Sequence, residues 1–436
     1  MVKIAYLANR FPLAVEPYVG EEILELLERG VQVFAGSVQR SDERPRRAAN
    51  HLPAAEISCV RPVRLLTFLR ALGMFVRHWE RISYLVKRVL LRGKESPQRR
   101  LKTLLHTWLG ACYAVQMQEC EVDHIHAHHG YFGSWIAMVA ARLLGVGFSL
   151  TLHGSDLLVD GAYLDTKLQN CRFCVTISEY NRRHILKHFP TVDSKKILVS
   201  RLGVDAGGTE SSKVQITTGA LPTLNLLAVG RLHKVKDHAF LIRACARLRD
   251  RGLDFHCLIA GEGLERQSLE RLILKNQLRD RVSLFGHASQ EQLDCLYRRA
   301  DVVVLTSRSE GLPLVLMEAM VRGRIVLAPA ITGIPEIVIP GKTGFLYMPG
   351  SMDDFVGRIY FLREMLNVEG RHATSRLAWM RHGARIQVLR NFDRKTNLTR
   401  FCDRLLRLIA LPEFASAENW SPPNEDIVLQ QVQLPV

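Results

Sequence analysis

The sequence lacks a long uninterrupted hydrophobic run. Its longest apolar stretches, residues 62–76 and 131–152, are interrupted by Arg64 and Arg70 and by Arg142. A membrane-spanning helix needs about 18 or more consecutive apolar residues. The opening run MVKIAYLANRFP is too short for the apolar core of a signal peptide and has the composition of a strand. The sequence therefore predicts neither a transmembrane segment nor a signal peptide.

Cysteines are too scattered to predict a metal site or a set of disulfides. Of the nine, Cys171 and Cys174 are the only close pair, and no second such pair or zinc-type histidine spacing accompanies them. We interpret the cysteines as reduced core thiols, with a redox pair at 171 and 174 as the alternative. Reduced thiols favour a cytoplasmic location.

Acidic residues are few relative to basic ones: 43 Asp and Glu stand against 59 Lys and Arg, a formal net charge of +16. This excess predicts an anionic partner, which can be nucleic acid, an acidic membrane surface or a phosphorylated ligand. It is concentrated between Arg61 and Lys102, where twelve Lys or Arg face only Glu80 and Glu95 and alternate with large apolar residues at helical spacing. Basic amphipathic helices of this kind bind anionic lipid headgroups. A solvated basic face is the alternative, and no nucleic-acid-binding motif accompanies the charge.

Short apolar runs rich in Val, Ile and Leu alternate with stretches of helical spacing, which predicts parallel sheets built from βα units. A chain of 436 residues, 47% hydrophobic, exceeds what one core usually contains. We therefore expect an α/β fold with two Rossmann-like domains whose parallel sheets face each other across a cleft. The predicted strands are 3–8, 31–37, 123–129, 148–154, 173–178 and 196–204, then 224–232, 255–263, 282–288, 302–307, 325–330 and 344–349.

The domain boundaries follow from composition. Residues 206–222 are small, polar and glycine-bearing and are predicted to link an N-terminal domain, 1–205, to a second domain, 223–385. Residues 386–412 are expected to be helices that could pack back on the first domain. The tail, 413–436, has no convincing period and is expected to be loosely ordered.

The strongest motif is SRSEGLPLVLMEAM at 307–320, directly after a predicted strand. A strand, a turn at Gly311 and a helix that starts near Leu312 and Pro313 together form a site for an anion such as pyrophosphate. Glu318, about two turns into the helix, could accept hydrogen bonds from ribose hydroxyls. Glu310 stands at the strand end, where a sugar ring would lie. The alternative is two surface glutamates on an ordinary helix.

This string resembles the donor-domain signature of the family-4 retaining glycosyltransferases of the GT-B fold, and the whole chain looks closest to exopolysaccharide and colanic-acid-type members. AVGRLHKVKDH at 228–238 is similar to the family's GRL…K segment, although Asp237 stands where a glycine is usual. AGEG at 260–263, GIPEIV at 333–338 and GKTGFL at 341–346 match further family loops.

The resemblance implies roles for four more residues in binding the donor. Arg231 and Lys236 would neutralise its diphosphate, and Gly261 and Glu262 would lie beside it. Fixed cations stabilise a leaving group that gains negative charge as its bond breaks. Because no paired-aspartate metal motif is present, we expect a metal-independent reaction with the nucleotide-diphosphate sugar as co-substrate and no cofactor.

In the first domain, TLHGSDL at 151–157 places His153 at the carboxyl end of a buried strand. The segment resembles the family's HG-x-D element, which implies that His153 lies against the donor sugar, while Asp156 caps the next turn. Three histidines, His124, His126 and His128, share one face of a strand but are spread over about 13 Å, too far to bind one ion together. We interpret them as core or cleft-lining residues.

The loop at 8–23 follows the first strand and resembles the corresponding loop of exopolysaccharide transferases. Its residues Asn9, Arg10, Phe11 and Glu16 are the candidates for acceptor binding, and an ordinary exposed loop is the alternative. We therefore expect a hexosyltransferase on the inner face of a membrane. Its acceptor would be a saccharide or a lipid-linked glycan. A sugar-nucleotide epimerase or hydrolase and a non-catalytic sugar-binding scaffold are the alternatives, and the oligomeric state is open.

Overall fold

The computed structural model describes residues 2–13, 16–41, 57–93, 95–159, 161–205, 223–369 and 376–411. These residues form two compact units. Unit 1 comprises Met1–Ile177, Arg182–Ser200 and Leu398–Val436, and unit 2 comprises Ser178–Asn181 and Arg201–Asn397. Apart from Ser178–Asn181, the chain passes into unit 2 after Ser200, five residues before the predicted end of the first domain, and unit 2 continues to Asn397, beyond the predicted end at 385. The predicted linker 206–222 and tail 413–436 lie outside the described residues.

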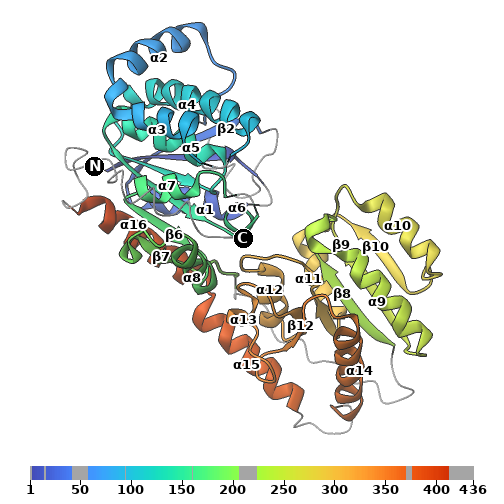
Figure 1. The fold of residues 1–436 in the computed structure, drawn as a ribbon. Helices are drawn as coiled ribbons and strands as arrows, with labels where there is room; N and C mark the ends of the chain where they lie inside the picture. The colour runs from blue at the N-terminus through green and yellow to red at the C-terminus, as the bar shows by residue number, and fades with distance from the viewer. Residues whose placement is uncertain are drawn as a thin grey trace. The chain divides into compact units, whose positions relative to one another are not determined.

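Unit 1 is built on a seven-stranded, wholly parallel sheet with the strand order β3-β2-β1-β4-β5-β6-β7 (Figure 1). Parallel strands buried on both faces need continuous apolar runs, which is what the sequence provides. The strands are β1 (Lys3–Arg10), β2 (Gln32–Gln39), β3 (Ser58–Cys59), β4 (His124–His128), β5 (Gly147–Leu152), β6 (Phe173–Thr176) and β7 (Ile197–Val199).

Helices cover both faces of this sheet. One face is covered by α1 (Pro17–Glu28) and by α16 (Arg394–Ala410), whose Phe401 and Leu405 share a core with Tyr6 and Ile23. The other face is covered by a layer that contains α3, α4 and α5, with α2 packed on α4. Besides α1 and α16, the helices of this part of the chain are α2 (Leu65–Arg77), α3 (Trp79–Leu91), α4 (Pro97–Gln118), α5 (Phe132–Leu144), α6 (Ser155–Leu158), α7 (Leu164–Asn170), α8 (Glu179–His188) and the 3-10 turn η3 (Ser194–Lys196).

Unit 2 is built on a six-stranded parallel sheet with the order β10-β9-β8-β11-β12-β13. Read along the chain of this unit, the order is 3-2-1-4-5-6, the arrangement of the doubly wound Rossmann fold. The strands are β8 (Leu224–Val229), β9 (Phe255–Ala260), β10 (Val282–Gly286), β11 (Val302–Val304), β12 (Ile325–Pro329) and β13 (Phe345–Tyr347). All six correspond to predicted strands.

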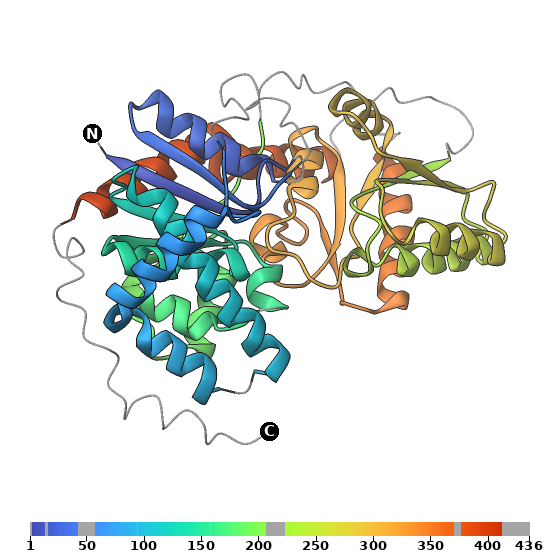
Figure 2. The same cartoon turned by 90° about the horizontal axis from the view of Figure 1, so that it is seen from above.

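Figure 2 shows the helices that flank the sheet of unit 2. The core of this unit lies between the strands and α9, α10, α14 and α15, while α12 packs on β12 and α15. The helices are η4 (Lys234–Lys236), α9 (His238–Asp250), α10 (Arg266–Lys275), α11 (Gln290–Arg299), α12 (Leu314–Val321), α13 (Ile334–Ile337), α14 (Met352–Glu369) and α15 (Arg376–Asn391).

One strand of unit 1 was not predicted, and the basic segment is helical, as its spacing indicated. The strand β3 has only two residues and was not predicted, because so short a run carries no periodic signal. The basic segment 61–102 forms α2, α3 and the first residues of α4. No helix among the described residues is both long enough and apolar enough to cross a bilayer.

Candidate functional site

Two of the predicted site residues of unit 2, Lys236 and Glu310, meet where the strand order reverses, between the loops that follow β8 and β11. In sheets of this kind, ligands bind outside the carboxyl ends of the strands at this switch point. Hydrogen bonds tie the two loops together: Arg308 N donates to Val235 O at 2.8 Å, and Thr306 Oγ1 donates to Lys236 O at 3.1 Å. The sheet topology therefore brings together residues that are distant in the chain.

Lys236 and Glu310 form an ion pair at this point, with Nζ 2.5 Å from Oε1. Both side chains are largely buried, and the Ser307 hydroxyl also donates to Glu310 Oε1 at 2.5 Å. Ion pairs shielded from water hold their geometry better than exposed ones. Arg231, five residues before Lys236, is exposed. Its side chain has no hydrogen-bond or ion-pair partner among the described residues. Its guanidinium can therefore bind a ligand without first breaking a contact.

Asp237 explains how this chain does without the usual glycine. It adopts φ 46° and ψ 45°, a left-handed conformation that glycine tolerates best and that aspartate is one of the few other residues to adopt. Its carboxylate caps α9 by accepting from Phe240 N at 3.2 Å and pairs with Arg308 Nε at 2.7 Å. These bonds offset the strain and keep the turn that presents Lys236.

Two glycines allow the loops of the site to approach each other closely. A Cβ on Gly261 would lie 1.9 Å from Gly230 O, so any side chain there would separate the loops after β8 and β9. A Cβ on Gly333 would lie 2.4 Å from Gly311 O, which joins the GIPEIV segment to the turn after β11. The neighbouring Glu262 is exposed and pairs with Arg266 at 2.7 Å. The glycines of AGEG at 260–263 and GIPEIV at 333–338 thus have a steric role: they let the loops of the site lie close together.

The helix α12 begins at Leu314, two residues later than expected, because Pro313 is its extended N-cap residue. Leu312 and Pro313 are buried in the turn. On the next turns of α12, Glu318 Oε2 accepts a hydrogen bond of 2.8 Å from Tyr297 Oη of α11. Burial raises the pKa of Glu318, and the Tyr297 bond only partly opposes this shift. No sequence pattern marks Tyr297 as a partner of Glu318. Ser307, the partner of Glu310, is the first residue of the motif at 307–320.

In unit 1, the three predicted histidines do share one face of β4, and they form a buried hydrogen-bonded network with β5. His124 Nε2 and His126 Nδ1 each lie 2.7 Å from Ser149 Oγ, and His126 Nε2 lies 3.0 Å from Thr151 Oγ1. His128 Nδ1 lies 3.1 Å from His153 Nε2. Hydrogen bonds therefore link the first two histidines to Ser149 and Thr151 and, in a separate group, link His128 to His153, the histidine predicted to lie against the donor sugar.

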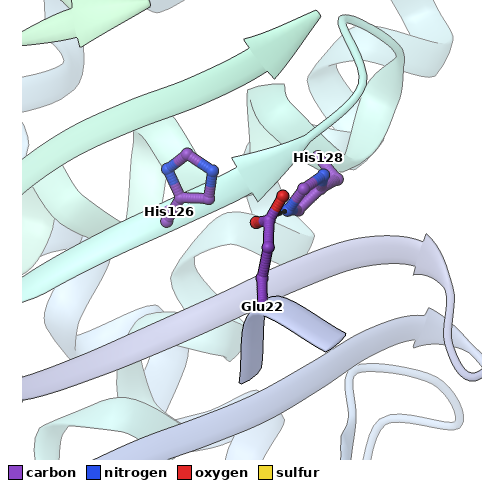
Figure 3. Close-up of side chains that lie close together, drawn as sticks. All are labelled: Glu22, His126 and His128. Carbon is purple, nitrogen blue, oxygen red and sulfur yellow. Dashed lines mark hydrogen bonds and ion pairs between the residues drawn. The ribbon is translucent and has the colours of Figure 1, made fainter. Parts of the chain in front are cut away.

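Glu22, from α1, points its carboxylate at the ring of His128, and His126 lies earlier along the same strand, β4 (Figure 3). Its Oε2 is 3.0 Å from His128 Nε2, and ligand atoms of Glu22, His126 and His128 lie within 4.8 Å of one another. Two histidines and a carboxylate are a possible cation-binding set. However, both nitrogens of His126 and of His128 already have protein partners, so a cation would have to displace several hydrogen bonds.

Glu22 was not predicted as a site residue. It is a buried acid on the apolar face of α1, alongside Val19, Ile23 and Leu26. An acidic residue in an apolar stripe was the available signal, since buried carboxylates need partners.

Beside this network, His129 lies between two carboxylates. Its Nε2 is 3.2 Å from Glu16 and its Nδ1 is 3.7 Å from Asp156. Burial opposes the charged imidazolium, but the neighbouring carboxylates of Asp156 and Glu16 outweigh it and raise the pKa of His129 to about 10. Burial, His129 and His128 act in the opposite direction on His153 and lower its pKa well below the ordinary value. A cationic and a neutral imidazole thus lie with their ring centroids 4.5 Å apart.

Asp156 is held by three backbone N–H groups, those of Gly130, His153 and Gly154, at 2.7–3.2 Å. It therefore caps the turn after β5, and it also fixes the start of the loop after β4. The ring of Tyr18 stacks on that of His153, with the ring centroids 4.5 Å apart.

The four predicted acceptor residues have different surroundings. Glu16 contacts His129, as described, and Asn9 Oδ1 accepts from Gly133 N of α5 at 2.8 Å. Arg10 is exposed and donates to Gln39 at 3.0 Å. Phe11 is instead 5% exposed and packs in the core under α1 and α16, because the chain turns inward after β1. The structure thus brings Glu16 to His129, whose ring lies beside that of His153, and gives Arg10 and Phe11 other contacts.

Comparison with known proteins identifies relatives of both halves. The family model for Glycosyltransferase Family 4 matches residues 15–207, and that for Glycosyl transferases group 1 matches residues 221–372. A Salmonella typhimurium protein that bears the name colanic acid biosynthesis glycosyltransferase WcaL is 26% identical over 410 residues, which is 82% of this chain and 90% of the relative. The amylovoran biosynthesis glycosyltransferase AmsK of Erwinia amylovora is 31% identical over 164 residues, 36% of this chain and 40% of its own.

Among solved structures, HepE of Anabaena, crystallised in complex with UDP, superposes with a TM-score of 0.67 at 18% sequence identity. The superposition covers 93% of this chain and all of HepE. At this level of identity the likeness concerns the fold, and it assigns the described units to the GT-B architecture.

Proposed function

This chain belongs to the family-4 glycosyltransferases of the GT-B fold and resembles the exopolysaccharide-type members, and from this premise we propose the reaction that it catalyses. It transfers a hexose from a nucleotide-diphosphate sugar to a hydroxyl group of a saccharide or lipid-linked acceptor, with retention of configuration at the anomeric carbon.

The meeting of Lys236 and Glu310 at the switch point of unit 2 is the observation that carries the proposal. The diphosphate of the donor binds Arg231 and Lys236 and the turn before α12, where a glycine and a helix N-terminus favour an anion. Glu318 accepts from the ribose hydroxyls. When the diphosphate binds, Lys236 exchanges part of its contact with Glu310 for the phosphate, which leaves the Glu310 carboxylate next to the sugar.

The cations supply the chemistry that a metal supplies elsewhere, because they stabilise the diphosphate more as its negative charge grows during bond breaking. For retention we propose front-face attack, in which the acceptor hydroxyl adds to the anomeric carbon and its proton passes to the departing phosphate. His153, neutral because its pKa is lowered, orients the sugar as a hydrogen-bonding group. No covalent sugar–enzyme intermediate is required.

A peripheral position on an anionic membrane is the second part of the proposal. Leu65, Leu69, Leu72 and Val76 follow one another at helical spacing along α2 and are 48–75% exposed. The helix has no acidic residue, and Arg64, Arg70 and Arg77 belong to or flank it. An exposed apolar stripe edged by cations is the composition of a helix that lies in a lipid headgroup layer.

An epimerase or hydrolase on the same fold would consume the donor as fast without an acceptor as with one. A sugar-binding scaffold would bind the donor without consuming it. The sequence has all four side chains of the proposed donor site, Arg231, Lys236, Glu310 and Glu318, which favours an enzyme.

Donor binding is tested by thermal shift with UDP, GDP, ADP and TDP sugars, because a ligand that binds only the native state raises the melting temperature. One nucleotide sugar is expected to stabilise the protein. The variant Lys236→Ala should lose that shift, while Lys275→Ala, an exposed lysine at the end of α10, should keep it. Equal shifts in the two variants would contradict the proposed donor site.

A further inference from the structure

Three side chains of unit 1 form a series of hydrogen bonds that ends at His153. Glu22 Oε2 of α1 lies 3.0 Å from His128 Nε2, the contact drawn in Figure 3, and His128 Nδ1 lies 3.1 Å from His153 Nε2. All three side chains are buried, so water does not readily replace these contacts. We refer to Glu22, His128 and His153 as the buried triad.

The chemistry of the three groups gives these hydrogen bonds a direction. A carboxylate can only accept, so His128 Nε2 donates to Glu22. A neutral imidazole has one N–H and one acceptor nitrogen, so Nδ1 of a neutral His128 ring accepts from His153 Nε2. Burial and the neighbouring His129 and His128 lower the pKa of His153 well below its ordinary value, so this ring is also neutral. The proton of His153 then lies on Nε2, and its Nδ1 carries a lone pair.

The second nitrogen of His153 is the free end of the buried triad. Nδ1 is buried and has no hydrogen-bond partner among the described residues. A buried N–H without a partner is rarer than a buried acceptor without one, which agrees with a lone pair at this atom. Because Nε2 is taken by His128, Nδ1 is the nitrogen through which the ring can bind a ligand. Its neighbours must shift before a hydroxyl group can reach it.

Aromatic packing holds the rings of the buried triad in place. The ring of Tyr6 stacks on that of His128 with centroids 5.7 Å apart, and Tyr6 Oη donates to Glu22 Oε2 at 3.4 Å. Burial raises the pKa of Tyr6, so its hydroxyl keeps the proton that it donates. The ring of Tyr18 stacks on that of His153. With the ring planes held in this way, the position of the proton on His153 is what Glu22 and His128 are left to determine.

We infer that Glu22 and His128 are positioning residues for His153, and that they make its Nδ1 an acceptor for a hydroxyl group of the sugar. The inference rests on the proposed function, in which His153 hydrogen-bonds the sugar, and it adds the direction of that bond. Nδ1 then selects a sugar that has a hydroxyl group at this position over an analogue that has hydrogen or fluorine there, because neither of these can donate.

The direction of the bonds is tested by NMR on the full chain, labelled with nitrogen-15 histidine and without ligand. The resonances of His153 are those that disappear in His153→Gln. Correlations between ring hydrogens and ring nitrogens distinguish a protonated nitrogen from a bare one. In the wild type we expect a protonated Nε2 and a bare Nδ1. A proton on Nδ1 in the wild type would overturn the inference.

The role of Glu22 is tested by the same spectra of Glu22→Gln. The amide can donate as well as accept, so both tautomers of His153 become populated and its two nitrogen shifts move toward each other. Glu28→Gln, an exposed change at the end of the same helix, should leave both shifts unchanged. Wild-type shifts of His153 in a folded Glu22→Gln would also overturn the inference.

Thermal unfolding checks that Glu22→Gln folds, since Glu22 is buried. If it does not fold, the double variant Glu22→Gln and His128→Asn takes its place, because removing a buried acid together with its partner destabilises less than removing one of them. The asparagine amide can donate or accept next to His153, so the same mixing of tautomers is expected. A single tautomer in the double variant, with the proton on Nε2 as in the wild type, would show that Glu22 and His128 do not set it.

The contact with the sugar is tested with UDP-glucose, GDP-mannose, ADP-glucose and TDP-glucose. The nucleotide sugar that raises the melting temperature should move the Nδ1 resonance of His153 more than the Nε2 resonance. In Glu22→Gln its turnover number should fall by about tenfold, the usual net worth of one hydrogen bond, with little change in KM because the nucleotide supplies most of the binding. Glu28→Gln should keep the wild-type turnover.

The two sets of measurements separate the inference from the proposed function. If none of the four sugars raises the melting temperature, the result counts against the proposed function, and the ligand-free spectra still decide whether Glu22 sets the tautomer of His153. If one of them binds and leaves the Nδ1 resonance where it was, the proposed sugar contact of His153 is wrong.

Discussion

Lys236 Nζ lies 2.5 Å from Glu310 Oε1, although 74 positions separate the two residues in the chain. A comparable pair occupies the equivalent position in unit 1, where Glu16 from the loop after β1 lies 3.2 Å from His129 in the loop after β4. In each unit the pair joins the two strands at which the sheet order reverses. Each unit therefore presents one acid and one cation at the edge where ligands of such sheets bind.

Replacing Glu310 with glutamine is expected to lower the turnover number by about 100-fold or more, the usual cost of removing one positioned charged group next to a reacting centre. The amide has nearly the same shape and can still contact Lys236 and Ser307, so the melting temperature should change little. The measurements are initial transfer rates and thermal unfolding. Glu270→Gln, on the exposed side of α10, is the matched control. Unchanged turnover in Glu310→Gln would refute the proposed catalytic role.

The stability of unit 1 is expected to depend on the charge of His129. Its pKa is raised to about 10 in the folded chain, so the stabilisation that it provides is complete below pH 6.5 and is lost as the pH rises through about 10. His129→Gln should therefore lower the free energy of unfolding by about 3 kcal/mol near pH 6, because Glu16 and Asp156 lose their partner. The difference from wild type should shrink toward pH 10.

The measurement for His129 is urea unfolding at several pH values. His256→Gln, an exposed histidine on β9, serves as control and should leave the curve unchanged. A constant difference between His129→Gln and wild type from pH 6 to pH 10 would show that the charge of His129 is not responsible.

Removing metal ions is expected to have no effect. Both nitrogens of His126 and His128 already take part in protein hydrogen bonds, and the proposed reaction uses cationic side chains at the diphosphate. Dialysis against EDTA should leave the transfer rate and the melting temperature unchanged. A bound zinc ion in stoichiometric amount, present in wild type and absent from Glu22→Gln, would instead assign Glu22, His126 and His128 as its ligands.

The exposed face of α2 is expected to bind anionic lipid. In flotation at moderate salt, the wild type should rise with phosphatidylglycerol vesicles and not with phosphatidylcholine vesicles. Leu65→Gln combined with Leu69→Gln should weaken binding to these vesicles by about 100-fold or more, because each buried leucine contributes about 1.5–3 kcal/mol. Leu264→Gln combined with Leu274→Gln, two exposed leucines of unit 2, is the control. Equal flotation with both kinds of vesicle would remove the support for membrane binding.

Much of the fold was predictable because its signals are local. Strands buried on both faces of a parallel sheet must be continuously apolar, so 12 of the 13 strands that the described residues form could be recognised, and Ser58–Cys59 was too short. The motif at 307–320 was predictable for the same reason, since a strand, a turn and a helix N-terminus follow one another without interruption. The departure at Asp237 was visible in the sequence, but its explanation needed the left-handed backbone and the Arg308 pair.

Residues whose role depends on a partner from another element could not be found in this way. Glu22 and Tyr297 come from helices that the sequence marks only as amphipathic, and their contacts with His128 and Glu318 depend on how each helix packs. Phe11 shows the opposite case. It belongs to a loop that looks open in sequence, but the chain direction after β1 buries it.

The two sheets, the turn that contains Glu310 and the family could be inferred from the sequence, because each depends on contiguous runs of residues whose spacing has a direct physical meaning. The contact of Lys236 with Glu310, the charge of His129 between two acids, and the series of hydrogen bonds from Glu22 to His153 became apparent from the packed fold. These properties depend on distance, burial and electrostatic potential, and all three arise when elements from distant parts of the chain pack together.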